Sequence, residues 1–277
     1  MIQSKSYGLQ NETRQYLRRL YAYGRELNPS DVADIDNFIK GLKQLNLWQN
    51  IVCWPMRSIH NIGSGSNALS LGGGQQVGAD ATLLNAATWS VDGIVRSTAG
   101  GPLFSTPIRD IGVAPVAHGA VFKNATDLGN NVGYWFTAGV NVSGRQFSIG
   151  NSSVTNAQNF TCYVNLWPPG VGSVSELNVG GGASTPFTRT GRHYFSMRLT
   201  SGTTARFTLN TNQVNQSVAG SNWNTSTPSF VRFGGYNVAL NSTTSLVFLS
   251  NSLVSDSQDL ALYNLIKTTI GKGLGLP

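Results

Sequence analysis

Charge is scarce in this chain. Only 11% of the 277 residues are charged, 19 of them basic and 12 acidic, against roughly 25% in an average globular protein. The net charge of +7 comes from the shortage of acids, because the basic residues are few and scattered. No run of basic residues alternates with aromatic ones, which is the pattern expected of a nucleic-acid surface. The sequence therefore predicts no nucleic-acid partner.

Long apolar runs are absent as well. No stretch approaches the roughly 20 apolar residues that a membrane span needs, and residues 1–8 are polar where a secretion signal would be apolar. Gly, Asn, Ser and Thr replace the missing charges, which is typical of extracellular and virion β-proteins. Such a composition without a secretion signal predicts a protein that is assembled in the host cytoplasm into a virus particle, with no membrane insertion.

Cysteine and histidine are also scarce. Cys53 and Cys162 stand beside apolar residues in predicted strands, which favours buried thiols and leaves a single disulfide open. The three histidines are His60, His118 and His193, and no group of His and Cys has the spacing of zinc ligands. No Gly-x-Ser-x-Gly motif is present. The sequence thus indicates neither a zinc site nor a nucleophilic centre.

Acidic pairs are missing from most of the chain. Hydrolysis of a glycosidic bond needs two carboxylates held about 5–10 Å apart. From residue 50 onward the only glutamate is Glu176, and its neighbours Ser173, Ser175 and Asn178 supply no second acid. We therefore predict that the protein is not an enzyme.

Two helices are predicted at the start of the chain. Apolar residues at three- and four-residue spacing predict a helix over residues 8–26, and Ser30 is the predicted N-cap of a second helix that ends near Trp48. This hairpin, residues 1–49, is too small to hold a core alone. We predict that it docks on the rest of the chain or on a neighbouring chain. Its candidate assembly residues are Tyr16, Leu20, Arg18 and Arg19.

After residue 50 the pattern changes to short apolar segments separated by Gly, Asn, Pro and Ser. So many strands without intervening helices predict a two-layer antiparallel sandwich over residues 50–277. The predicted strands are 51–57, 68–71, 88–96, 103–105, 117–123, 132–140, 144–150, 160–166, 174–179, 192–200, 203–210, 229–234 and 244–250.

Three segments resemble parts of one known family. The ending SFVRFGGYNVALNSTTSLVFLSNSLVSDSQDLALYNLIKTTIGKG, residues 229–273, resembles the end of laminin-G-like, concanavalin A-like jelly-roll domains, and WSVDGI at 89–94 resembles their early Trp-x-x-Asp-Gly-Ile/Leu phrase. Residues 34–57 resemble a segment that precedes such domains in tailed-phage proteins, although Asn46 stands where Gly is usual. The resemblance implies a mainly β, two-sheet antiparallel jelly-roll sandwich with an N-terminal α-helical hairpin and a short C-terminal helix over 255–270.

The same resemblance implies a structural protein of a tailed bacteriophage virion. Tail fibre, baseplate, adhesin and capsid decoration are all open as its place in the particle. Its expected partners are other virion proteins, further copies of itself and a glycan of the host surface. A free carbohydrate-binding lectin, calcium-dependent in one version, is the alternative from another class. A degraded or unusual glycan hydrolase is the third.

Two groups of residues are candidates for ligand binding. A sugar platform needs an aromatic face beside planar polar side chains, and the predicted residues are Trp223, Asn222, Asn224 and Tyr236. The alternative is that Trp223 packs against one edge of the sandwich. A calcium loop would use Asp127, Asn124 and Asn130, and an ordinary Asx-rich turn explains the same residues. We expect no other cofactor.

Overall fold

The computed structural model describes most residues near the two ends of the chain and, between them, mainly the residues in strands. The described residues are 8–72, 79–95, 103–108, 116–124, 133–140, 146–151, 161–165, 175–178, 191–201, 204–217, 231–233, 242–250 and 255–277.

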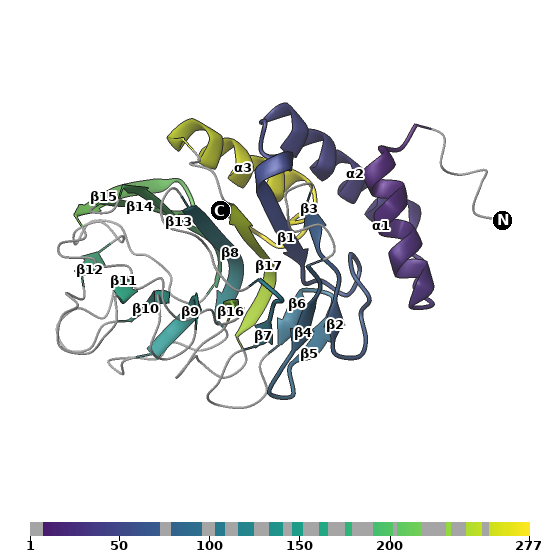
Figure 1. Ribbon diagram of the computed structural model, residues 1–277, viewed down its shortest axis with the longest axis horizontal. Coiled ribbons are helices and arrows are strands. Elements are labelled where there is room, and N and C mark those ends of the chain that lie inside the picture. Colours follow the sequence, from purple (N-terminus) through teal and green to yellow (C-terminus); the bar gives the residue numbers. More distant parts are fainter. Residues whose placement is uncertain are drawn as a thin grey trace.

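The strands form two antiparallel sheets, here called sheet A and sheet B (Figure 1). The order in sheet A is β15 (Asn212–Ser217), β14 (Thr204–Leu209), β13 (Gly191–Ser201), β8 (Val116–Asn124), β17 (Thr243–Ser250), β1 (Ile51–Pro55) and β3 (Leu71–Gly72), with β6 (Gly93–Val95) beside β17 and β5 (Thr88–Ser90) beside β6. The order in sheet B is β12 (Ser175–Asn178), β11 (Thr161–Asn165), β10 (Gln146–Asn151), β9 (Gly133–Val140), β16 (Val231–Phe233), β7 (Phe104–Ser105), β4 (Ala81–Leu83) and β2 (Asn67–Ala68).

The chain crosses repeatedly between the sheets, so strands distant in sequence become neighbours. In sheet A, β17 lies between β8 and β1, and in sheet B, β16 lies between β9 and β7. Such crossovers distinguish a jelly roll from a simple meander. The predicted fold, a concanavalin A-like two-sheet jelly-roll sandwich flanked by helices at both ends, is confirmed.

The side chains of β1 alternate between the two faces of sheet A, as the period of a strand requires. Trp54 points to sheet B, where its ring centroid lies 6.3 Å from that of Phe104. Ile51 and Cys53 belong instead to the core that the helices share. Cys53 is a free, buried thiol, so of the two predicted alternatives the buried thiol is confirmed for this residue.

In the described part of the chain, the helices on the outer side of sheet A are α1 (Asn11–Ala22), α2 (Pro29–Gln44) and α3 (Asp256–Thr268) (Figure 1). The prediction of Ser30 as the N-cap of α2 was wrong. The cap is Asn28, whose side chain accepts a hydrogen bond from the Asp31 backbone N–H at 3.0 Å. Pro29 occupies the first helical position, where its missing N–H costs nothing. Helix α3 begins with a capping box between Ser255 and Gln258.

Helices and sheet A share one hydrophobic core. Every residue of β1 and of β17 is buried, because sheet B covers one face of these strands and the helices cover the other. Helices α2 and α3 meet at Gly41, where a Cβ atom would overlap the side chain of Leu265. Buried Asp36 joins α2 to α1 by accepting hydrogen bonds from the Thr13 hydroxyl at 2.6 Å and the Gln10 backbone N–H at 2.7 Å. The division of the chain into a helical hairpin, residues 1–49, and a sandwich, residues 50–277, stays a prediction.

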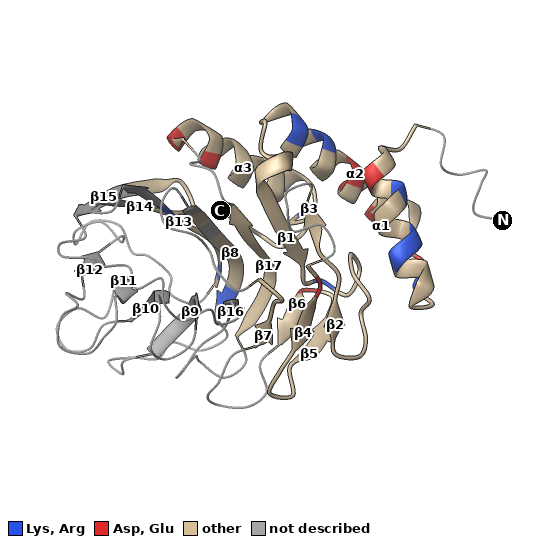
Figure 2. Ribbon diagram, viewed as in Figure 1, with Lys and Arg blue, Asp and Glu red and all other residues tan. Residues whose placement is uncertain are grey.

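Charged residues of the described part gather on the helices, while most of the strands carry none (Figure 2). Within the described residues, the helical layer is therefore richer in charge than the strands. In this layer, Lys40 pairs with Asp36 at 2.7 Å, and Lys43 pairs with Glu12 at 2.7 Å.

Candidate functional site

The four predicted assembly residues all lie on α1, but in different surroundings. Tyr16 and Leu20 are buried in the core shared with sheet A, and the Tyr16 hydroxyl donates a hydrogen bond to the carbonyl oxygen of His60 at 2.9 Å. Arg19 is half-buried, donates to the carbonyl oxygen of Ser70 at 3.0 Å and pairs with Asp80. Arg18 is exposed. A role of this group in assembly stays a prediction, and within it Arg18 has the most accessible side chain.

Most of the predicted ligand residues lie outside the described residues. This holds for Trp223, Asn222, Asn224 and Tyr236 of the predicted sugar platform, and for Asp127 and Asn130 of the predicted calcium loop. Asn124 is the last residue of β8, where its backbone is paired with that of Gly191. Both sites stay predictions.

A polar network that is buried except at Asp256 holds α3 on sheet A. The carboxylate of Asp259 accepts hydrogen bonds from the Tyr194 hydroxyl at 2.7 Å and from the Ser196 hydroxyl at 2.8 Å. Arg198, also buried, pairs with Asp256 at 2.7 Å. We call these five residues the α3 network. Its carboxylates already have hydrogen-bond or ion-pair partners, which indicates a structural role.

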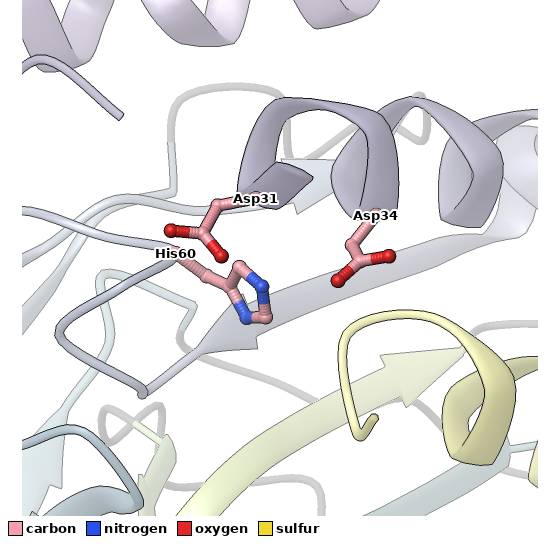
Figure 3. A group of neighbouring side chains, drawn as sticks. All are labelled: Asp31, Asp34 and His60. Carbon is pink, nitrogen blue, oxygen red and sulfur yellow. The ribbon is translucent and has the colours of Figure 1, made fainter. Parts of the chain in front are cut away.

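A second cluster lies under the start of α2 and consists of Asp31, Asp34 and His60 (Figure 3). One ligand atom of each residue lies within 4.8 Å of the other two. Asp31 and Asp34 share a face of α2 because they are three positions apart. The His60 imidazole comes from the turn after β1 and lies between the two carboxylates (Figure 3). We call this group the Asp–Asp–His cluster.

The turn that carries His60 is held firmly from both sides. The backbone N–H of His60 donates to the carbonyl oxygen of Arg57 at 3.0 Å, and its own carbonyl accepts from Tyr16. The buried Asn61 amide donates to the carbonyl oxygens of Pro55 and Leu69 at 2.7 and 2.9 Å. The imidazole is therefore carried on a rigid backbone.

The imidazole of His60 is neutral at physiological pH. Its side chain is fully buried, and neither ring nitrogen has a hydrogen-bond partner among the described residues. Burial, followed by the nearby Arg57 charge, lowers the pKa of His60 to about 3. A neutral imidazole presents a free lone pair, which is the form that ligates a metal.

The negative charge of the cluster's carboxylates is only partly offset by nearby groups. Burial, followed by repulsion from Asp34, raises the pKa of Asp31. Arg57 attracts both carboxylates at a distance. Its guanidinium donates to the carbonyl oxygens of Val91, Ile270 and Lys272 at 2.9–3.0 Å. It therefore acts on the carboxylates as a charge while its hydrogen bonds join the turn to the segment after α3.

Sequence spacing did not indicate this cluster. Asp31 and His60 are far apart along the chain, and a motif search finds ligands that are close together. The signal available in the sequence was the pair Asp31 and Asp34 on one helix face. This pair alone does not show which residue from another element lies opposite the two carboxylates.

None of the helices in the described part of the chain combines the length and the apolar character that a membrane crossing requires.

Comparison with known proteins finds likeness in structure alone. No protein-family model matches the chain, and no curated protein matches it significantly in sequence. Among solved structures, the Trypanosoma rangeli sialidase in complex with sialic acid is similar with a TM-score of 0.56 and 11% identity, over 85% of this chain and 39% of the sialidase chain. The botulinum neurotoxin serotype D binding domain is similar with a TM-score of 0.57 and 7% identity, over 79% of this chain and 52% of that chain.

These likenesses describe the fold. The present chain spans about two fifths of the sialidase and about half of the toxin structure, and identities this low carry the β-sandwich alone. They also correct one prediction. The acid count led us to predict that the protein is not an enzyme, and the similarity to sialidases contradicts this. The count of acidic residues tested only for a pair of glycosidase carboxylates on one strand. A fold shared with enzymes can hold catalytic sites of other kinds.

Proposed function

We propose that this protein binds glycans through its sandwich and serves as a structural component of a tailed-phage virion. The observation that carries the glycan part is the fold, which is shared with a sialidase solved with sialic acid and with the receptor binding domain of botulinum neurotoxin D. Those ligands and roles belong to the neighbouring structures. For this chain they are the reason to test glycan binding.

The surface of sheet A under the helices is an unsuitable place for a sugar. Tyr194, Phe248 and Leu246 on that side belong to the core that the helices close.

We therefore propose Trp223 as the sugar platform, with Asn222 and Asn224 beside it in the sequence and Tyr236 as a second aromatic residue. The flat apolar face of an indole packs on the C–H face of a sugar ring, and the amides offer donors and acceptors to its hydroxyl groups.

Glycan-array binding by the purified full-length protein tests this proposal. We expect the wild type to bind a defined set of glycans and Trp223→Ala to lose that binding at least tenfold. The matched control is Trp89→Ala, which removes a half-buried indole whose N–H donates to the carbonyl oxygen of Gly65. Binding that survives Trp223→Ala, or that falls equally in both variants, contradicts this site. The array repeated with EDTA and with added calcium tests the calcium loop of Asp127, Asn124 and Asn130.

A sialic-acid hydrolase is a second candidate, favoured by the fold shared with the Trypanosoma rangeli sialidase. A fluorogenic sialoside, followed over time, separates turnover from binding. Glu176→Gln tests the one glutamate beyond residue 50. Sugar release that this variant abolishes would identify a hydrolase with Glu176 in its site. Binding without release favours the first candidate.

The virion part of the proposal is supported by the resemblance of residues 34–57 to a segment that precedes laminin-G-like domains in tailed-phage proteins. It predicts that the protein is found in purified particles, in a defined ratio to other virion proteins, and that it forms homo-oligomers. Mass spectrometry of gradient-purified particles measures this. A protein that is absent from intact particles, and present only in the free fraction of the lysate, contradicts it.

A further inference from the structure

We propose that Asp31, Asp34 and His60 form a binding site for a zinc ion, with one imidazole nitrogen, one oxygen from each carboxylate and a water as ligands. The site is distinct from the predicted sugar platform and calcium loop, and the proposal does not depend on glycan binding. Three properties of the cluster support it.

The first is the state of His60. Buried polar atoms in folded proteins almost always have a hydrogen-bond partner. Here a fully buried imidazole lacks a partner at both ring nitrogens among the described residues and lies between two carboxylates (Figure 3). A ligand that accepts its lone pair would explain why the ring is held in this position.

The second is charge. Asp31 is buried, and repulsion from Asp34 adds to the effect of burial in raising the pKa of Asp31. Arg57 and Arg25 offset part of this charge from a distance. The hydrogen bonds of Arg57 are directed to three carbonyl oxygens and those of Arg25 include the carbonyl oxygen of Ser58. A dication between the carboxylates would cancel the repulsion directly.

The third is the donor set. Calcium and magnesium prefer sites made of oxygen alone, whereas a neutral imidazole with two carboxylates suits zinc or a similar transition metal. Zinc with three protein ligands and a water has metal–ligand distances of about 2.0–2.2 Å. The three ligand atoms lie within 4.8 Å of one another, so a modest rotation of half-buried Asp34 would bring them into range.

Bound zinc would join the helical layer to the sandwich. Two ligands come from α2 and the third from the turn after β1, which Arg57 connects to the carbonyl oxygens of Ile270 and Lys272. A ligand that binds the folded state and not the unfolded one raises stability by mass action. We therefore expect zinc to raise the melting temperature as well as to bind.

The experiment uses the full-length protein, stripped with EDTA and dialysed free of chelator. Isothermal titration with zinc chloride should give one site per chain, and the melting temperature should rise with zinc concentration. Asp34→Asn keeps the shape of the side chain and should weaken zinc binding by more than about tenfold, since the loss of even an outer partner of a metal ligand costs roughly 10–100-fold. The matched control is Glu26→Gln, which removes an exposed acid from the loop between α1 and α2 and should bind zinc as the wild type does.

A second variant, His60→Asn, removes the imidazole but changes a fully buried residue and can fail to fold. Asp34 is half-buried, so Asp34→Asn decides the test, and an unchanged circular dichroism spectrum shows that this variant is folded. Cobalt chloride adds a visible spectrum that reports nitrogen and oxygen ligands, and this spectrum should be lost in Asp34→Asn. Failure of the folded wild type to bind zinc overturns the proposal. So does equal zinc binding by Asp34→Asn and Glu26→Gln, and so does a preference for calcium or magnesium at these residues.

Discussion

The α3 network and the Asp–Asp–His cluster each place an aspartate under a helix, facing sheet A in the first case and the turn after β1 in the second. They differ in how their polar atoms are satisfied. Asp259 is almost fully buried and accepts hydrogen bonds from two hydroxyl groups. His60 is equally buried, and neither of its ring nitrogens has a partner in the described part of the chain. A satisfied buried network stabilises the fold by itself. An unsatisfied buried group needs an explanation, and for His60 we propose that a metal ion provides it.

The largest expected effect comes from breaking the satisfied group. Asp259→Ala leaves the hydroxyl groups of Tyr194 and Ser196 buried without their acceptor and removes a negative charge near Arg198. Loss of one partner of a buried charged pair costs roughly 3–5 kcal/mol, and we expect a fall of that size in the free energy of unfolding. Urea denaturation measures it, with Glu26→Gln as the control. A fall no larger than that of the control would refute the structural role of the network.

The next effect comes from adding zinc, the ligand that we propose for the cluster. At a free zinc concentration 100 times its dissociation constant, wild-type stability should rise by about 2.7 kcal/mol. Asp259→Asn should keep this gain, because the α3 network is separate from the cluster. Asp34→Asn should lose about half of it or more, since a tenfold weaker site gains only about 1.4 kcal/mol at the same zinc concentration. Urea denaturation with and without zinc gives the comparison. A gain that is the same in both variants would place the metal elsewhere.

The free energy of unfolding should depend on pH through His60, which belongs to the Asp–Asp–His cluster. The folded-state pKa of His60 is about 3, lowered by burial and by Arg57 from an ordinary value of 6.5, so the unfolded chain takes up a proton first as the pH falls. The stability that neutral His60 contributes is complete above pH 6.5 and is lost between 6.5 and about 3. The slope is at most about 1.4 kcal/mol per pH unit. Between pH 7 and 5 the metal-free protein should lose about 2 kcal/mol on this basis.

Urea denaturation of the EDTA-treated protein at several pH values measures that loss. In His60→Asn, the loss between pH 6.5 and 5 should be smaller than in the wild type. Equal slopes in the two proteins would mean that another group titrates in this range.

The smallest effect is expected from Asp34→Asn without metal. The substitution removes a charge that repels Asp31, so metal-free stability should stay within about 1 kcal/mol of the wild type, as for most surface changes, or rise slightly. Asp259→Asn offers the contrast, because it changes a carboxylate with two hydroxyl donors and should lower stability. Thermal unfolding in EDTA compares the two variants, and a larger loss in Asp34→Asn would make the cluster a structural network like the other.

Much of the fold follows from local pattern. Alternation over residues 192–200 and 203–210 predicted the hairpin that the structure contains as β13 and β14. Strands β4 and β15 were not predicted. Residues 81–83 are too few to establish a period, and β15, NQVNQS, is polar at most positions. The predicted single strand 88–96 is a hairpin, β5 and β6, because Gly93 adopts φ 141° and packs on the backbone of Thr244.

The sequence by itself determined most of the element types, the two-layer β-sandwich and the amphipathic character of α1, α2 and α3, because these depend on spacings of two to four residues. The jelly roll was implied by the resemblance of the chain's ending to laminin-G-like domains. Only the tertiary structure decided that the helices close the outer face of sheet A, and that Tyr16 and Leu20 lie in its core. It also brought His60 to Asp31 and Asp34. That meeting depends on how α2 packs against the turn after β1, and packing between elements distant in sequence has no local period to predict it.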